Sequence, residues 1–178
     1  MDPNLRQRII NEAYKLFISK GIKHTSFCDI AVAVNKSKGA VMHYFPSKNQ
    51  LVNTVIENCF FPSSALSPEM ELLADKEWSE FIQNYKNPIE RAIHYFPDKQ
   101  DKIGLLHYMQ FISSANEYMS EFPQKYQELL AEEQRFLFNV ISKTITKHNL
   151  IVNDIQTFSR QSFEMSIGNT FLKLIYSK

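Results

Sequence analysis

A chain of 178 residues, 44% of them hydrophobic and only four of them glycine, can bury a core, so an all-α protein is expected rather than a disordered or β-rich one. Two cysteines, Cys28 and Cys59, do not make a disulfide framework, and the lack of a signal pattern or of an apolar run of about 18 residues predicts a cytoplasmic protein without a membrane segment. The net charge of +1 divides into +5 for residues 1–50, with eight Lys or Arg and three acids, and −4 for the remainder, with 12 and 16, which indicates a polyanion-binding part joined to an acidic part.

Helices are predicted at the start of the chain over residues 4–19, 27–34, 38–45 and 48–60. Gly21 follows the first helix, where a left-handed C-cap is expected. Asn35, which adopts the left-handed conformation readily, turns the chain between the second and third helices. Pro46 ends the third helix, in which Val41 and Phe45 stand four residues apart and are expected to pack inward.

Prolines, serines and asparagines mark the later breaks, and the remaining helices are predicted over residues 68–85, 88–96, 99–119, 122–148 and 152–176. The last two are long and apolar on more than one side, so one side can belong to a core and the other to a partner subunit. We therefore predict a homodimer in which these two helices and their symmetry mates form a four-helix bundle.

The segment from Thr25 to Lys48 carries the functional signal. Two short helices joined by about three residues make a helix-turn-helix, whose second helix enters the major groove of DNA. On the outward side of that helix, Lys38 and His43 can donate to phosphates or to guanine. The small Gly39 and Ala40 let the backbone approach the groove. Hydroxyl and free N–H groups at helix N-termini bind phosphate. Predicted helices begin at both ends of this segment, so phosphate contacts are expected there.

From about Arg8 to Leu51, the sequence resembles the N-terminal domain of the TetR family of transcriptional repressors. The matching residues are Leu16-Phe17-Ile18-Ser19-Lys20-Gly21, Thr25, Asp29-Ile30-Ala31, Ser37-Lys38-Gly39, His43-Tyr44-Phe45 and Ser47-Lys48. The resemblance implies a DNA-binding transcriptional regulator, a ligand-responsive dimeric repressor. Its three-helix helix-turn-helix domain would span residues 1–48, and a helical ligand-binding and dimerisation domain would span residues 49–178.

The resemblance also implies which residues meet a palindromic double-stranded operator. Those that face DNA are Ser37, Lys38, Gly39, Ala40, His43 and Tyr44. Tyr44 and Lys48 would hold the phosphate backbone, and Thr25 or Ser26 would touch a phosphate from the second helix. Lys36 stands where the family usually has a small apolar residue, which places an extra cation near the DNA.

An aromatic group between residues 78 and 118 is a candidate pocket for a small, largely apolar effector. Its members are Trp78, Phe81, Phe96, His107, Tyr108, Phe111 and Tyr118. Each of them is also compatible with an ordinary place in the core. The five histidines lack the clustering with acids that a zinc site shows, so neither a metal nor another cofactor is expected.

Two other classes of protein compete with the regulator. An enzyme is not supported, because the sequence has no Gly-rich phosphate loop, nucleophile elbow or recognisable catalytic set. A helical adaptor or interaction protein, whose basic N-terminal head contacts a protein or a membrane surface, is the remaining alternative. Binding to the DNA upstream of the protein's own gene discriminates between the regulator and both alternatives.

Overall fold

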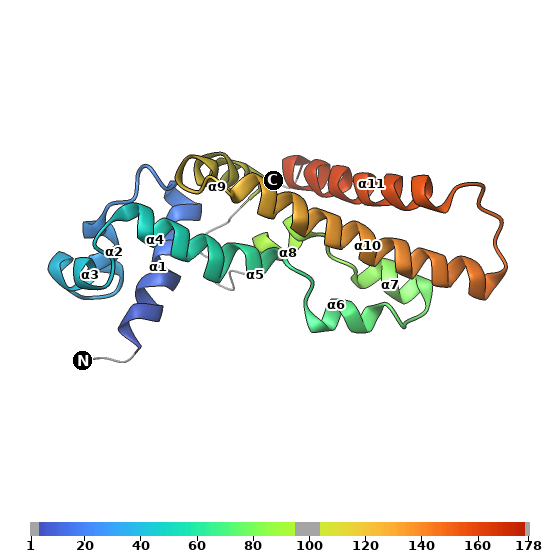
Figure 1. Ribbon diagram of the computed structural model, residues 1–178, viewed down its shortest axis with the longest axis horizontal. Helices are drawn as coiled ribbons and strands as arrows, with labels where there is room; N and C mark the ends of the chain where they lie inside the picture. The colour runs from blue at the N-terminus through green and yellow to red at the C-terminus, as the bar shows by residue number, and fades with distance from the viewer. Residues whose placement is uncertain (1–3, 95–103, 177–178) are drawn as a thin grey trace. The chain divides into compact units, whose positions relative to one another are not determined.

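The computed structural model describes residues 4–94 and 104–176, and helices are the only regular elements in these ranges (Figure 1). Their bounds are α1 Leu5–Lys20, α2 Phe27–Ala33, α3 Lys38–Tyr44, α4 Lys48–Val55, the π-helix η1 Ile56–Phe60, α5 Phe61–Ser64, α6 Pro68–Leu73, α7 Trp78–Asn84, α8 Pro88–His94, α9 Leu105–Tyr118, α10 Phe122–His148 and α11 Ile155–Tyr176. The predicted all-α class is therefore confirmed. None of these described helices is both long and apolar enough to cross a membrane.

The chain divides into two compact units, one made of residues 1–63 and 92–125 and the other of residues 64–91 and 126–178. These units follow packing, so α4, η1 and α9 belong with the N-terminal helices in the first unit. The predicted division at residue 48 concerns where the DNA-binding segment ends. Packing does not test that boundary, which stays a prediction.

In the first unit, α1 is surrounded by other helices. It contacts α2, α4, η1 and α9, and it buries Ile9, Ala13 and Phe17 completely. Gly21 follows with φ 89° and ψ 146°. The positive φ favours glycine as expected, but the ψ lies outside the left-handed helical region, so the predicted left-handed C-cap is not what ends α1.

Serine caps begin the three short helices that follow. The side chains of Ser26, Ser37 and Ser47 each accept a hydrogen bond at 3.2 Å from the backbone N–H three residues further on. Asp29 completes a capping box with Ser26. Such caps stabilise a helix start by about 1 kcal/mol each, and they fix where α2, α3 and α4 begin. Asn35 has φ 53°, which confirms the predicted left-handed turn before α3.

The helix after Ser47 departs from the prediction, because it does not end at the proline-rich break. It passes through the π-helix η1 and continues as α5, with Pro62 inside it. A proline cannot donate to the carbonyl four residues earlier, and its ring collides with that carbonyl in a regular α-helix. The wider π turn, which ends at Phe60 and contains the residue four positions before Pro62, relieves this conflict. Phe60, at the end of this turn, stacks on Phe111 with ring centroids 5.0 Å apart.

In the second unit, two helices replace the single one predicted over residues 68–85. The break between α6 and α7 falls at residues 74–77, where Asp75 and Glu77 form ion pairs with Lys143 and Lys147 of α10. The charged run here interrupts the apolar stripe, and aspartate is a poor helix former. After the break, Phe81, Leu137, Val140 and Phe163 form a buried apolar cluster that packs α7, α10 and α11 together.

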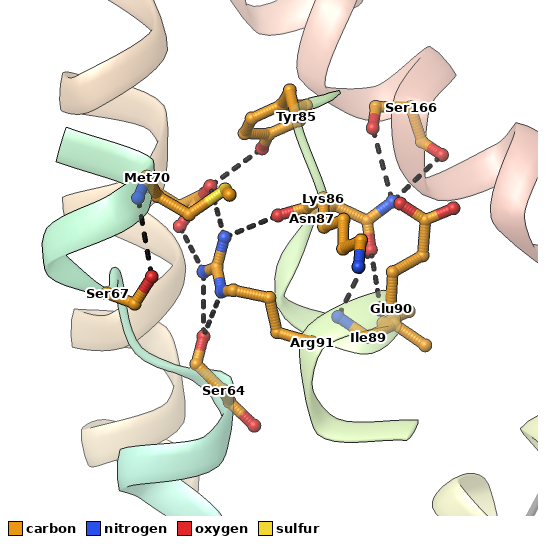
Figure 2. A network of polar contacts seen from close by, with 11 residues as sticks. Ser64, Ser67, Met70, Tyr85, Lys86, Asn87, Ile89, Glu90, Arg91 and Ser166 are labelled. Atoms are coloured by element: carbon orange, nitrogen blue, oxygen red, sulfur yellow. Dashed lines mark hydrogen bonds and ion pairs between the residues drawn. The ribbon is translucent and has the colours of Figure 1, made fainter. Parts of the chain in front are cut away.

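A buried polar network surrounds the start of α8 (Figure 2). The Arg91 guanidinium donates to both carboxylate oxygens of Glu133, at 3.1 and 2.6 Å, and the two side chains are only 7% and 1% exposed. Arg91 also donates to the Ser64 carbonyl at 2.7 Å, and the Tyr85 hydroxyl donates to Glu133 at 2.7 Å. Burial and the adjacent carboxylate raise the pKa of Tyr85 far above its usual range. The two buried charges, on Arg91 and Glu133, are thus paired with each other.

Asn87 extends the same network to α11. Its amide nitrogen donates to the Thr170 hydroxyl at 2.7 Å and to the Ser166 carbonyl at 3.1 Å. Its amide oxygen accepts the backbone N–H groups of Ile89 and Glu90, both at 3.1 Å, which caps α8. A single buried asparagine thus both begins α8 and ties it to the last helix.

Candidate nucleic-acid interface

The packing of α2 against α3 defines which side of α3 faces solvent. Val41 and Phe45 are 0% and 1% exposed, as predicted, and Val34 at the end of α2 is buried as well. Because these apolar residues face the interior of the first unit, the remaining side chains of α3 point away from it. The structure thus confirms the predicted division of α3 into an inner and an outer face.

The outer face collects most of the residues that the sequence assigned to DNA. Exposed side chains or backbone are found at Lys36, Ser37, Lys38, Gly39 and His43, with Ala40 and Tyr44 half-buried beside them. The rings of His43 and Tyr44 lie edge to face, with centroids 5.5 Å apart. An imidazole, a phenol and two ammonium groups are donors that suit base edges and phosphates.

The surroundings of Gly39, among the residues that the structure describes, leave room for a side chain. A Cβ atom added there would meet nothing nearer than the Ser37 hydroxyl, at 3.9 Å, which is an ordinary contact. Glycine inside a helix costs roughly 0.5–1 kcal/mol relative to alanine. The folded chain offers no compensation for that cost within the described residues. A helix surface without a side chain at this point allows an external partner to approach the backbone.

Lysines from α3, from α4 and from the turn between α1 and α2 surround a hollow beside α3. It is lined by Lys23, His24, Thr25, Ser26, Phe27, Cys28, Lys38 and Lys48. The Lys48 ammonium donates to the Lys23 carbonyl at 3.4 Å, and burial lowers the pKa of Lys48. Three lysines around one hollow make a surface that attracts a polyanion.

Lys23 and His24 were missed by the sequence reasoning. They lie in the turn between α1 and α2, where no helical spacing indicates the direction of a side chain. Their only signal was the positive charge of the N-terminal part of the chain.

Thr25 and Ser26 occupy different environments. Thr25 is 1% exposed, and its hydroxyl oxygen lies 3.2 and 3.0 Å from the carbonyl oxygens of Leu16 and Gly21, to either of which it can donate. Ser26 is exposed and caps α2. The sequence allowed either residue to touch a phosphate through its side chain, and the structure brings only the Ser26 hydroxyl to the surface. Thr25 instead closes the turn after α1.

The residues predicted to line the effector pocket are divided between the two units, as far as the structure describes them. Trp78 and Phe81 stack in the second unit, with centroids 5.6 Å apart. Tyr108 and Phe111 are buried in the first unit around Phe60.

The other three predicted members complete this picture. The His107 ring accepts the Gly104 N–H at 3.3 Å, and Tyr118 is half-buried. Phe96 lies outside the described residues. A surface hollow in the second unit is lined by other residues, namely Glu71, Ala74, Phe136, Asn139, Val140, Ser142 and Lys143. The effector pocket stays a prediction.

Histidine, cysteine and carboxylate side chains do not assemble into a metal site anywhere in residues 4–94 or 104–176. Cys28 is exposed beside the lysines, and Cys59 is buried, which raises the pKa of its thiol to about 11. The chemistry that this region offers is therefore charge and hydrogen bonding.

Comparison with known proteins assigns the same region to a family. Residues 9–55 match the model of the bacterial regulatory proteins of the tetR family. The biofilm operon icaADBC HTH-type negative transcriptional regulator IcaR of Staphylococcus epidermidis is 32% identical over 56 residues. That stretch is 32% of this chain and 30% of IcaR, so the match spans less than a third of that relative's length.

Two solved structures share the fold along most of the chain. The TetR family transcriptional regulator PfmR from Thermus thermophilus has a TM-score of 0.52 at 20% identity, over 96% of this chain and 86% of PfmR. SmeT, solved as a triclosan complex, has a TM-score of 0.55 at 16% identity, over 97% of this chain and 81% of SmeT. At these identities the likeness concerns the fold alone.

Proposed function

We propose, from the premise that this chain belongs to the tetR family of bacterial regulatory proteins, that it is a dimeric repressor of transcription that binds operator DNA through α3. The observation that carries this proposal is the outer face of α3. It combines donors at Lys38 and His43 with Gly39, a helical glycine that the fold itself does not need. Close approach to a major groove gives that glycine a purpose.

Phosphate contacts would come from the elements around α3. Lys48 at the start of α4, Ser26 at the start of α2 and Tyr44 at the end of α3 flank the reading face. Such contacts fix the register of a protein on DNA without reading its sequence. We therefore expect Lys38 and His43 to set sequence preference and the flanking groups to set overall affinity.

Dimerisation would use the outer side of α11. Phe158, Met165 and Leu172 are exposed and follow one another at intervals of seven residues, which is the spacing of a helix–helix contact. Gly168, on the same helix, has no atom within 4 Å of an added Cβ, so another helix can come close there. Phe171 is exposed beside them.

The dimer is tested by charge substitution on this side of α11. Met165→Glu together with Leu172→Glu puts carboxylates on a surface that a second copy would bury, so we expect monomers in sedimentation at micromolar concentration. Gln156→Glu is the control, because Gln156 is an exposed polar residue of α11 that stands two residues before Phe158 and so points to another side of the helix; this variant should stay dimeric. A wild-type protein that sediments as a monomer would rule out this mode of assembly.

An effector, where one acts, would be a small and largely apolar molecule. Aromatic side chains are plentiful in both units, and a structure of the same fold, SmeT, is a triclosan complex. A thermal-shift screen checks this point. Stabilisation only by sugar-like or polyanionic compounds would count against an apolar effector.

The experiment that tests the function is a gel shift with the DNA upstream of the protein's own gene, in the presence of excess unrelated duplex. We expect a retained complex and a footprint on two half-sites about one helical turn apart or a multiple of it. An adaptor with a basic head would bind the unrelated duplex equally well or bind neither DNA. Either of those results would rule out the proposed repressor function.

A further inference from the structure

We propose that Glu117, at the end of α9, restrains DNA binding by neutralising Lys23, a cation of the DNA-facing hollow. This inference rests on the proposed function and adds a residue pair to the same surface. Lys23 would be a phosphate contact, and Glu117 would compete with the phosphate for it. The pair would thus set how tightly the protein holds DNA and how strongly that affinity depends on salt.

The geometry of the pair is direct. The Lys23 ammonium lies 2.9 Å from each of the two Glu117 carboxylate oxygens. The hydrogen bond to Glu117 and its negative charge raise the pKa of Lys23, so the ammonium stays charged while its charge is compensated. The two side chains are 57% and 53% exposed, so both can be reached from solution. Exposed ion pairs of this kind are weak and exchange partners readily.

The position of Lys23 gives the pair its relevance to DNA. Lys23 lines the same hollow as Lys38 and Lys48, and its carbonyl accepts the Lys48 ammonium. Two of the three lysines here already have proposed DNA contacts, and they come from α3 and α4. The third belongs to the turn between α1 and α2, and it alone among them is paired with a carboxylate in the described structure.

Glu117 has no favourable role in its own helix. It is the second-last residue of α9, where the partial negative charge of the helix C-terminus disfavours a carboxylate. The backbone that carries it is well fixed, because Phe111 and Ala115 of α9 are buried and α9 packs on α1 and α4. The acid is therefore held next to Lys23 by a rigid element, and Lys23 is its compensating partner.

Counterion release turns this arrangement into a measurable quantity. A lysine that neutralises a phosphate releases about 0.9 of a condensed cation from the DNA. In the wild type, Lys23 must leave Glu117 first. Added salt screens this exposed pair and makes it easier to open, which partly offsets the loss of DNA affinity that salt causes. Without the carboxylate the offset disappears. Removal of Glu117 should thus strengthen binding at low salt and steepen its salt dependence.

The test uses the full chain and fluorescence anisotropy with the operator and with an unrelated duplex, each over a series of salt concentrations. We expect Glu117→Gln to bind both DNAs several-fold more tightly at about 0.1 M salt and to steepen the log–log slope by up to about two per dimer, one per subunit. Lys23→Ala should bind both DNAs more weakly than the wild type. The double variant should behave like Lys23→Ala.

Glu121→Gln is the matched control, because it removes the same charge from an exposed acid four residues further along that is not paired with Lys23. It should leave the slope close to that of the wild type. An equal effect of Glu121→Gln, an unchanged Glu117→Gln, or the same gain in the Lys23→Ala background would each overturn the inference while leaving the repressor intact. A wild type that binds neither DNA would overturn both, and circular dichroism verifies that each variant is folded.

Discussion

Among the described residues, the two units differ in whether they bury charged side chains. In the first unit the interior is apolar and aromatic, and the lysines of α3, α4 and the turn before α2 lie at or near the surface. In the second unit an arginine and a glutamate are buried against each other at the centre of a hydrogen-bond network (Figure 2). A charge at the surface can bind another molecule, whereas a buried and paired charge affects only the stability of the fold. The same kind of substitution should therefore change binding in one unit and stability in the other.

The largest expected effect is on the buried pair. Arg91→Ala or Glu133→Ala leaves an uncompensated charge in the interior, which costs about 3–5 kcal/mol of unfolding free energy. Urea unfolding followed by circular dichroism measures this loss. Should the single variants fail to fold, the double variant Arg91→Met with Glu133→Leu removes both charges and should fold with a much smaller loss. A single variant within about 1 kcal/mol of the wild type would show that the network does not hold the second unit together.

Base reading by α3 is the next effect in size. Lys38→Ala or His43→Ala should cost about 1–3 kcal/mol of binding free energy at particular operator positions, with little change in unfolding free energy. Affinity measured against operators with single base changes locates those positions. Equal weakening on every sequence would make the altered residue a phosphate contact rather than a reader of bases.

A smaller effect separates fold from function at one residue. Gly39→Ala should raise the unfolding free energy by roughly 0.5–1 kcal/mol, because alanine is the better helix former and its Cβ fits without conflict. The same substitution should weaken operator binding, since the added methyl group stands between the backbone and the groove. Thermal unfolding and anisotropy on the same sample measure both quantities. Improved stability with unchanged DNA affinity would place Gly39 away from the DNA.

The first unit could be predicted from sequence further than the second because its signals are local. The turn at Asn35 and the spacing of Val41 and Phe45 both act within a few residues, and both are found in the structure. The direction of the side chains on α3 follows from them. The role of Thr25 could not be predicted in this way, because only the folded turn shows that its hydroxyl lies within donating distance of the Gly21 carbonyl.

Long-range pairing explains what the sequence did not predict. Arg91 and Glu133 are 42 residues apart, and Lys23 and Glu117 are 94 apart, so neither partner carries a sign of the other in its own neighbourhood. Taken alone in the sequence, each of them looks like an ordinary solvated charge. The continuation of the helix through Pro62 likewise depends on the π turn that precedes it, which no local pattern indicated.

The salt dependence of operator binding tests most directly whether the basic surface of the first unit is a DNA-binding surface. Anisotropy titrations from about 0.05 to 0.2 M salt should give a log–log slope near −5 for a wild-type dimer that neutralises about six phosphates. Lys48→Ala, which removes one backbone cation per subunit, should bring the slope to about −3 on operator and unrelated DNA alike. A slope near zero would contradict DNA binding through this surface. The same conclusion would follow if Lys48→Ala, Lys38→Ala and His43→Ala were each folded and each left the slope and the affinity unchanged.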